Sequence, residues 1–405
     1  MRQMIPLEEA RQIMLDAVRP LETIKVDLPD AFGMALAEDV TAPHPLPPFD
    51  RSPLDGYALR AADTVAAGRE HPAALTVTET IYAGHTAKGT VEPGTAMGIM
   101  TGAPLPPGAD CVIRFEDTRR EGNQVYIFSP LQPEQGVIHA GEDVAAGETV
   151  LTAGVTVDAG VTGLLAALGQ TRAAVRRQPR VALFSTGDEL LEPYSPLVPG
   201  RIYNSNLPAL AAQVREAGGI PLPGGNRPDQ TALITATIEQ ALKVSDLIVS
   251  TGGVSVGERD VVKEAMEAAG VEPLFWRAGF KPGTPVVCGR KDGRLVVGLS
   301  GNPAAAMITF ILLVRPVLRR LGGHREIDLP RVQARMAVGF PKGGRQRRFV
   351  RAVVRWRDGG YLARPAGLQS PGAMRSLVEG NALLDVPAGH GPLKEGEMVE
   401  AILIK

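Results

Sequence analysis

Hydrophobic and polar positions change their spacing several times along the chain, and each change predicts a different kind of element. Residues 5–19 carry apolar side chains at helical spacing after Pro6, and Glu8 and Glu9 lie near the expected N-terminus, where acids suit the helix dipole. Between residues 44 and 143 the pattern becomes short β-like runs separated by glycine and proline turns. These runs are 75–82, 109–115 and 124–128.

The segment 42–49 divides these two patterns. It contains four prolines, which remove backbone donors and fix φ, so it can be neither a helix nor a central strand. After residue 143 a turn-rich piece and a helix at 158–168 indicate a return to the first domain. We therefore interpret residues 44–143 as a β-rich domain inserted into another.

From Pro179 onward, apolar strands alternate with helices, which predicts a doubly wound parallel sheet. Ligands of such sheets lie beyond the carboxyl ends of the strands, so the glycine-bearing strand exits at 185–190 and 250–260 are expected on one rim. After His324 short strands resume, which predicts a small C-terminal β-barrel or sandwich. The expected elements are 181–185, 207–217, a strand near 220, 229–243, 247–250, 261–269, 349–356 and 398–404.

The length of the chain agrees with several domains, because 405 residues exceed what one core usually holds. The expected fold class is a multidomain combination of α/β and β: an elongated four-domain chain with a helical or extended first domain. The predicted domains are 1–43 with 144–177 (elongated first domain), 44–143 (β-rich insert), 178–326 (α/β) and 327–405 (β-barrel).

Composition excludes several classes of protein. A formal net charge of −1 gives no general attraction to nucleic acid. Cys111 and Cys288 are too few for a disulfide scaffold and are flanked by apolar residues, which favours buried free thiols. The six histidines show no metal-ligand spacing, and the apolar run 304–314 ends at Arg315, so a buried helix is favoured over a membrane span. Without an apolar signal core near the N-terminus, we expect a cytoplasmic protein.

The glycine-rich stretch from Ser250 to Asp260 is the most specific motif. It follows a strand and precedes a helix, so Gly252 and Gly253 let backbone N–H groups approach a phosphate or oxyanion. Ser255 can donate a hydrogen bond, and Asp260 can hold a divalent cation. The alternative is an ordinary glycine turn before a capped helix.

Acidic and basic residues accompany this stretch. Asp188 and Glu189 leave the preceding strand beside a glycine and suit a metal next to an anion; alternatively, Asp188 caps a local turn. Arg277 and Lys281 are two cations that can face one oxyanion, the alternative being surface charges beside a proline–glycine turn. The run Ser300-Gly301-Asn302-Pro303 repeats the strand-then-glycine design, and its backbone N–H groups and Asn302 can meet a ligand.

The predicted insert carries polar turn segments of its own. They contain Asp55, Thr101, and the pair Glu142 and Asp143. Each can be local turn chemistry, because Asp and Thr readily bond nearby backbone. Their combination with the loops above departs from chance.

Together these motifs resemble one family. They are Asp55-Gly-Tyr-Ala, Thr101-Gly-Ala-Pro-Leu-Pro-Pro-Gly-Ala-Asp, Gly141-Glu-Asp, Ser185-Thr-Gly-Asp-Glu-Leu, Gly252-Gly-Val-Ser-Val-Gly-Glu-Arg-Asp260, Lys281-Pro-Gly and Gly301-Asn-Pro. In this order they are similar to the molybdopterin molybdenumtransferase family of MoeA and the gephyrin E-domain, over essentially the whole chain. The resemblance implies that the α/β domain binds molybdopterin.

The resemblance further implies an enzyme of molybdenum cofactor biosynthesis. The expected reaction inserts molybdate into adenylylated molybdopterin with Mg²⁺ and releases AMP. A homodimer is expected, with the cleft shared between subunits, a molybdopterin adenylyltransferase as upstream donor, and neither nucleic acid nor a membrane as partner. The implied catalytic residues are Asp55, Thr101, Asp143, Glu189, Asp229, Asp260 and Lys281, of which Asp143, Glu189 and Asp260 are metal ligands; the implied binding residues are Gly252, Gly253, Ser255, Arg277, Ser300, Gly301, Asn302, Pro303 and Ser370.

Three departures from the family pattern matter for the expected site. The family usually continues Lys-Pro-Gly-Lys and Leu-Pro-Gly-Asn-Pro-Val-Ser, where this sequence has Thr284, Ser300 and Ala305. Cations in 342–351 can compensate, unless that run is only a solvated basic face. The alternatives to the enzyme above are a tungstate-preferring version, a non-catalytic molybdopterin-binding scaffold, and a nucleotide pyrophosphatase on the same fold.

Overall fold

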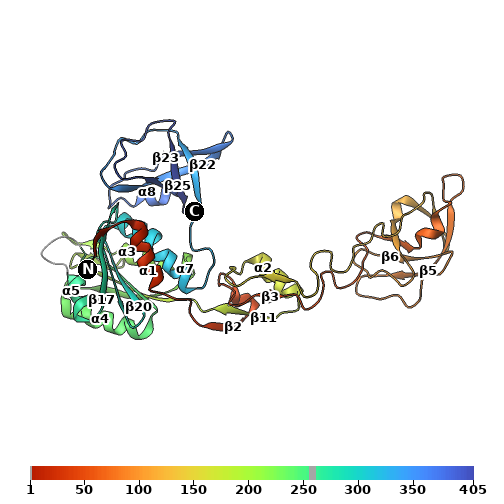
Figure 1. Cartoon of the computed structure of the whole chain (residues 1–405), viewed down its shortest axis with the longest axis horizontal. Coiled ribbons are helices and arrows are strands. Elements are labelled where there is room, and N and C mark those ends of the chain that lie inside the picture. Colours follow the sequence, from red (N-terminus) through yellow and green to blue (C-terminus); the bar gives the residue numbers. More distant parts are fainter. Residues whose placement is uncertain (1, 255–260) are drawn as a thin grey trace. The chain divides into compact units, whose positions relative to one another are not determined.

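The computed structural model describes residues 2–254 and 261–405. These residues form two compact units. The first contains the chain up to Glu38, Ala153–Val161 and Arg172–Lys405; the second contains Asp39–Thr152 and Thr162–Thr171. Figure 1 labels their elements. The expected mixture of α/β and β folding, with a closed C-terminal β-barrel, is confirmed.

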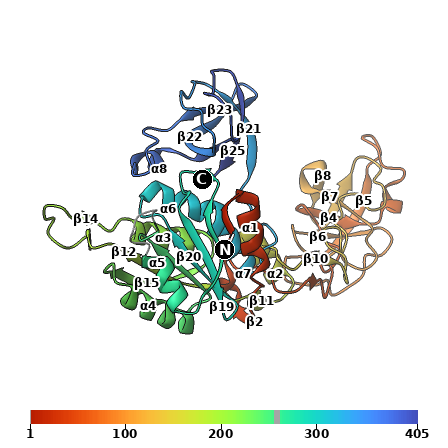
Figure 2. The same ribbon diagram turned by 60° about the vertical axis from the view of Figure 1, so that its left-hand side comes forward.

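A seven-stranded sheet with helices on both faces is the centre of the first unit (Figure 2). Its strands follow the order β1-β17-β19-β20-β16-β12-β15. Their bounds are β1 (Arg2–Ile5), β12 (Arg180–Thr186), β15 (Ile220–Arg227), β16 (Leu247–Thr251), β17 (Glu272–Ala278), β19 (Val286–Lys291) and β20 (Arg294–Leu299).

The sheet contains the predicted parallel strands, but it is mixed because one strand is reversed. Strands β15, β12, β16 and β20 are parallel to one another, but β19 is antiparallel to both of its neighbours. The cause is the hairpin turn at Asp292-Gly293, where both residues have positive φ (49° and 75°). An Asp-Gly pair between two strand-like runs favours a tight hairpin, which reverses the chain.

Side chains alternate between the two faces of the sheet because successive residues of a strand point in opposite directions. In β12, Val181 and Leu183 face one core, whereas Ala182 and Phe184 face the other. The first core is covered by α1 (Leu7–Asp16), α3 (Asn206–Glu216), α6 (Pro303–Thr309), a π-helical segment η4 (Phe310–Val314) and α7 (Arg315–Leu321), and the second by α4 (Thr231–Val244) and α5 (Val261–Ala268).

The N-terminus packs differently from the sequence prediction. Strand β1 pairs in parallel with β17, and α1 buries Ala10, Met14 and Leu15 in the core that it shares with α7. Residues up to 18 therefore pack with the α/β sheet, although the sequence predicts that they begin the elongated first domain. Periodicity identifies the helix but not the surface that its apolar face meets.

The C-terminal strands close into a barrel in the order β18-β22-β23-β21-β25-β24, with β22 also paired to β24. Strand β18 belongs to the loop after β17, so this short element joins the barrel to the α/β part. The bounds are β18 (Phe280–Lys281), β21 (Arg331–Met336), β22 (Arg347–Arg357), β23 (Gly360–Pro365), α8 (Arg375–Glu379), β24 (Ala382–Val386) and β25 (Met398–Leu403).

The second unit is built on a six-stranded sheet, β7-β4-β6-β5-β9-β8. Its strands are β4 (Gly56–Leu59), β5 (Ala73–Ile81), β6 (Thr95–Ile99), β7 (Cys111–Arg114), β8 (Thr118–Glu121) and β9 (Gln124–Ile127), with short 3₁₀ turns η2 (Ala61–Thr64) and η3 (Phe115–Asp117). The strands β3 (Val40–Thr41) and β10 (Thr149–Leu151), which pair with each other, lead into and out of it.

The remaining elements are short. Helix α2 (Ala159–Ala167) contributes residues to both units. In the first unit, β2 (Thr23–Asp27) pairs with β11 (Arg172–Arg176), η1 (Leu28–Ala31) follows β2, and β13 (Leu190–Leu191) pairs with β14 (Ile202–Tyr203).

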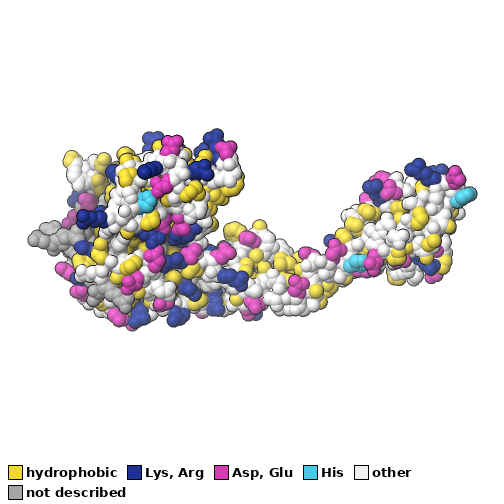
Figure 3. All heavy atoms as spheres, turned by 45° about the horizontal axis from the view of Figure 1, so that its top comes forward, with side chains coloured by type: hydrophobic (Ala, Val, Ile, Leu, Met, Phe, Trp, Pro, Cys, Tyr) yellow, Lys and Arg dark blue, Asp and Glu magenta, His cyan; other side chains and the backbone are white. Residues whose placement is uncertain are grey.

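Two expectations from composition are also tested. Cys111 and Cys288 are buried free thiols, and burial raises the pKa of both. Across the described residues no helix has the length and apolar character needed to cross a membrane. In Figure 3 acidic and basic side chains are interspersed over the visible face, in keeping with the net charge of −1.

Candidate functional site

The glycine-bearing loops after β12, β16 and β20 meet at the carboxyl edge of the sheet. Gly252 has φ +96°, and a Cβ there would lie 2.2 Å from the Thr186 carbonyl oxygen. A Cβ on Gly253 would lie 2.8 Å from Thr186 Oγ1, and one on Gly301 would lie 3.5 Å from Gly252 Cα. The first two positions therefore require glycine. Of the expected common rim of 185–190 and 250–260, the described part, 185–190 with 250–254, is present.

Asparagines from outside the predicted motifs tie these loops together. Asn206 at the start of α3 donates from Nδ2 to Thr251 Oγ1 (2.9 Å) and to the Gly301 carbonyl (2.8 Å). Asn204 donates to Ser185 Oγ (2.8 Å), which in turn donates to Asn226 Oδ1 (3.2 Å). These residues lie outside the sequence motifs, although Asn-Ser-Asn at the start of a helix is a polar signal at a strand-to-helix junction.

An acidic group lies at the same edge. Asp188 Oδ1 accepts a hydrogen bond from the Asp229 backbone N–H at 3.3 Å. Burial, and then the charges of Asp188 and Glu189, raise the pKa of Asp229, and its Oδ1 atom is buried without a hydrogen-bond partner. The structure thus brings together Asp229 and Glu189, which the resemblance implied, with Asp188. Ser255 and Asp260 lie outside the described residues.

A basic pocket lies where the α/β part meets the barrel, with a volume of about 460 Å³. Its cations are Lys281, Lys342 and Arg348, and its described lining contains no Asp or Glu. Ser300, Asn302, Thr284 and Ser370 add polar groups. An anion entering it therefore meets positive charge without a competing carboxylate, as oxyanion recognition needs.

Arg351 follows the pocket-lining residue Val350 and is 1 % exposed. Its Nη2 donates to the carbonyls of Leu368 (2.8 Å) and Ser370 (3.1 Å), while Nε and Nη1 are buried without partners. Desolvation lowers its pKa. A buried guanidinium without a carboxylate partner favours a nearby anion, and this one also holds the Gln369–Pro371 segment that lines the pocket. The basic run at 342–351 therefore supplies pocket cations and is not only a solvated face.

The three residues that depart from the family pattern, Thr284, Ser300 and Ala305, all line the basic pocket. The Thr284 hydroxyl donates to the Phe280 carbonyl at 2.6 Å, so it is engaged within its own loop. Ser300 Oγ accepts the Asn302 backbone N–H at 3.2 Å, and Pro303 opens α6 directly afterwards.

Arg277 does not line the basic pocket. Its guanidinium lies 4.4 Å from the centre of the Trp276 ring, in a backbone conformation with φ +67°. Of the two cations expected to face one anion, Lys281 is among the described lining residues of the basic pocket and Arg277 is not. The bend at Arg277 turns its side chain onto its own neighbour, a feature that charge spacing does not reveal.

In the second unit, Asp55 and Thr101 meet directly. Asp55 Oδ1 accepts the Thr101 backbone N–H (2.7 Å) and hydroxyl (2.8 Å), and these two bonds hold the pKa of the carboxyl below its usual value. Both side chains are exposed, as is Asp143. A rigid pair of polar groups is thus presented to solvent on this unit.

The comparisons with known proteins cover nearly the whole chain. Residues 5–169 match the model of the MoeA N-terminal region (domain I and II), 182–320 that of a probable molybdopterin binding domain, and 333–404 that of the MoeA C-terminal region (domain IV). A protein of Bacillus subtilis (strain 168) named molybdopterin molybdenumtransferase is 37% identical over 405 residues, which is 99% of this chain and 94% of that protein. This chain belongs to the molybdopterin molybdenumtransferase (MoeA) family.

Other MoeA relatives agree. Molybdopterin molybdenumtransferase 2 of Mycobacterium tuberculosis is 38% identical, with 94% of this chain and 95% of that protein covered. The crystal structure of the molybdopterin biosynthesis MoeA protein from Pyrococcus horikoshii OT3 superposes with a TM-score of 0.85 at 31% identity, covering 99% and 100% of the two chains. Membership of the MoeA family makes the chain a transferase of molybdenum cofactor biosynthesis.

Proposed function

We propose that the chain inserts molybdate into adenylylated molybdopterin in a Mg²⁺-dependent reaction that releases AMP and yields molybdenum cofactor. The observation that carries this proposal is the basic pocket. Lys281, Lys342 and Arg348 line it, and its described lining residues include no Asp or Glu. The glycine loops at Gly252 and Gly301 lie in contact on the neighbouring edge of the sheet. A doubly charged oxyanion and a pyrophosphate need such cations and backbone donors.

The magnesium part of the proposal depends on the acidic edge. Among residues 2–254 and 261–405 no three acid, His or Cys side chains form a complete metal-binding group. Asp229 Oδ1 is nevertheless a buried oxygen without a partner next to Glu189, which suits a divalent cation. We propose that Glu189 and Asp260 hold Mg²⁺. Its charge would assist departure of the AMP phosphate.

The decisive experiment mixes purified protein, adenylylated molybdopterin and Mg²⁺ with or without molybdate, and measures AMP. Release that requires molybdate is the expected result. AMP release without any oxyanion supports the pyrophosphatase alternative, and no release in either mixture refutes catalysis. Replacing molybdate by tungstate in the same assay shows whether this chain, with Thr284 and Ala305 in its pocket, prefers tungstate.

A scaffold that binds molybdopterin without catalysis is the second candidate, motivated by the departures at Thr284, Ser300 and Ala305. Asp260→Asn separates the two functions in a cell that lacks this protein. Under the scaffold function, the variant restores molybdoenzyme activity like the unchanged chain. Under the enzyme function, activity stays absent while the purified variant unfolds at the unchanged temperature.

We further propose that two copies share each cleft, with Asp55 and Thr101 of one copy serving the Lys281 pocket of the other. Mixing Asp55→Asn with Lys281→Gln protein tests this arrangement, because a mixed dimer then contains one cleft with both residues intact. Recovered activity supports sharing between subunits, and inactivity of the mixture after proven subunit exchange contradicts it. A molybdopterin adenylyltransferase is the proposed upstream donor of the adenylylated substrate.

A further inference from the structure

The basic pocket is assembled from two parts of the first unit that share a hydrophobic core, but the strand pairing between them is very short. Strand β18 pairs in parallel with β22, with Phe280 opposite Arg347 and Lys281 opposite Arg348. Lys281 and Arg348 both line the pocket. Two paired residues contribute few hydrogen bonds, so this alignment needs support from elsewhere.

Arg347, the residue before the pocket arginine, provides that support. Neighbouring side chains of a strand point to opposite sides, so Arg347 faces away while Arg348 faces the pocket. Arg347 donates from Nε and Nη2 to the two carboxylate oxygens of Asp385 (2.6 Å each), and from Nη1 to Glu8 of α1. The Asp385 side chain is 5 % exposed and that of Arg347 is 22 % exposed, so solvent weakens their bidentate bond little.

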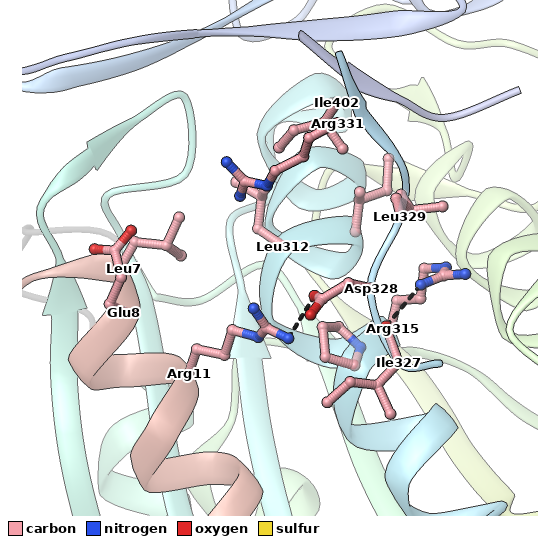
Figure 4. A pocket seen from close by; sticks show the side chains of 12 residues that line it. Leu7, Glu8, Arg11, Leu312, Arg315, Ile327, Asp328, Leu329, Arg331 and Ile402 are labelled. Carbon is pink, nitrogen blue, oxygen red and sulfur yellow. Dashed lines mark hydrogen bonds and ion pairs between the residues drawn. The ribbon is translucent and has the colours of Figure 1, made fainter. Parts of the chain in front are cut away.

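Glu8 brings the α/β core into this contact. Helix α1 is packed on the sheet through Leu7, Ala10 and Met14, so its acid is held by a rigid element. In Figure 4, Arg11 projects from α1 toward Asp328, in the chain that enters the barrel. There Arg11 bonds Asp328, and Arg315 donates to the Ile327 carbonyl at 2.9 Å. The Arg11–Asp328 and Arg315–Ile327 contacts hold the chain segment that enters the barrel, whereas the contacts of Arg347 hold strand β22.

We propose that Glu8, Arg347 and Asp385 form a clamp that holds β22 in register with β18 and thereby sets the affinity of the pocket for its oxyanion. The inference rests on the proposed function of that pocket. It makes Arg347 a positioning residue, since it touches the neighbouring strands and not the anion. It also assigns a role in substrate binding to Glu8, which lies outside every motif of the sequence.

The clamp and the anion act on the same pairing and are therefore coupled. An oxyanion bound by Lys281 and Arg348 bridges β18 and β22, so it stabilises the alignment that the clamp also stabilises. Coupling of this kind is reciprocal. Molybdate is thus expected to slow hydrogen exchange of the Lys281 and Arg348 amides, and loss of the clamp is expected to weaken molybdate binding.

The test uses Glu8→Gln, because its side chain is 67 % exposed and the substitution keeps its size. The matched control is Glu272→Gln, which removes an exposed ion pair with Arg290 (3.1 Å) outside the pocket lining. We expect Glu8→Gln to weaken molybdate binding in calorimetry about two- to fivefold, the range of a single exposed pair. Arg347→Gln, which also leaves Asp385 without its main partner, is expected to weaken binding by about tenfold or more.

Kinetics separate positioning from general damage. The clamp variants are expected to raise the KM for molybdate while kcat at saturating molybdate and the affinity for adenylylated molybdopterin stay unchanged. If Glu8→Gln has the same molybdate affinity and the same amide exchange as Glu272→Gln, the clamp proposal is overturned. Failure of the unchanged protein to bind molybdate at all overturns instead the proposed function on which the clamp rests.

Discussion

The glycine loop after β16 allows a prediction that separates backbone strain from steric contact. Gly252→Ala places a methyl group 2.2 Å from the Thr186 carbonyl oxygen in a residue with φ +96°. Gly293→Ala meets only the strain, since its φ is +75° with nothing within 4 Å. Gly301→Ala meets neither, because its Cβ would make an ordinary 3.5 Å contact with Gly252 Cα.

The magnitudes follow from these distances. A left-handed backbone costs a residue with a side chain about 1–2 kcal/mol, which is the expected loss for Gly293→Ala. In Gly252→Ala the methyl group and the carbonyl must also separate by about 1 Å, and such forced shifts in a packed region cost about 1–3 kcal/mol more. We therefore expect a loss of about 2–5 kcal/mol for Gly252→Ala and less than about 0.5 kcal/mol for Gly301→Ala.

Urea unfolding of the three variants under one condition measures this order. The midpoint should fall furthest for Gly252→Ala, less for Gly293→Ala and hardly at all for Gly301→Ala. Of the two rim variants, only Gly252→Ala should lose activity, because the methyl group of Gly301→Ala makes an ordinary contact. Equal midpoints for Gly252→Ala and Gly301→Ala would refute the argument that the loop is held against Thr186.

Three further predictions concern charge. Lys281→Gln and Arg348→Gln should each weaken molybdate binding about 10- to 100-fold in calorimetry, because each removes one charged hydrogen-bond donor; unchanged affinity in both would exclude this pocket as the oxyanion site. Burial, and then the charges of Arg319 and Arg315, lower the pKa of His324 to about 3. The neutral ring therefore stabilises the fold fully above pH 6.5, and this contribution is lost as the pH falls from 6.5 toward 3. The unchanged protein should therefore lose up to about 1.4 kcal/mol per pH unit more than His324→Gln over that window, and parallel unfolding curves for the two proteins would contradict this. Thr101→Val removes the hydroxyl that donates a hydrogen bond to Asp55, so the Asp55 pKa should rise toward its usual value in an NMR titration. The control Thr118→Val, whose hydroxyl bonds the Phe115 carbonyl, should leave the Asp55 pKa unchanged.

The sequence predicted those elements whose signal is local. Alternating strands and helices from Pro179 identified the doubly wound part, and the glycine loops identified its functional edge, because both patterns depend on neighbouring residues. The direction of β19 is also encoded locally, in the hairpin signal Asp292-Gly293. The π-helical segment at Phe310–Val314 interrupts a run that reads as one helix, since apolar periodicity alone does not distinguish the two turn types.

The rest depends on contacts between distant segments. The basic pocket joins Lys281 to Arg348 and Lys342, which lie on another strand and loop, so their meeting follows from the β18–β22 pairing and not from spacing. Arg351 reads as a member of a basic run, although its burial sets it apart from the exposed Arg345. Arg277 shows the opposite case, in which spacing suggests a shared site and a local bend turns the side chain away.

The pairing of β1 with β17 has a consequence for the order in which the molecule is made. Residues 2–5 leave the ribosome long before their partner strand 272–278, which follows about 270 residues later. At roughly 5–20 residues per second the first strand waits on the order of tens of seconds for its neighbour. The second unit, contained in Asp39–Thr171, is complete well before then and can fold during this interval. The α/β sheet therefore closes after the second unit, and until it closes the apolar side chains of β1 and α1 lack the core in which they are finally buried.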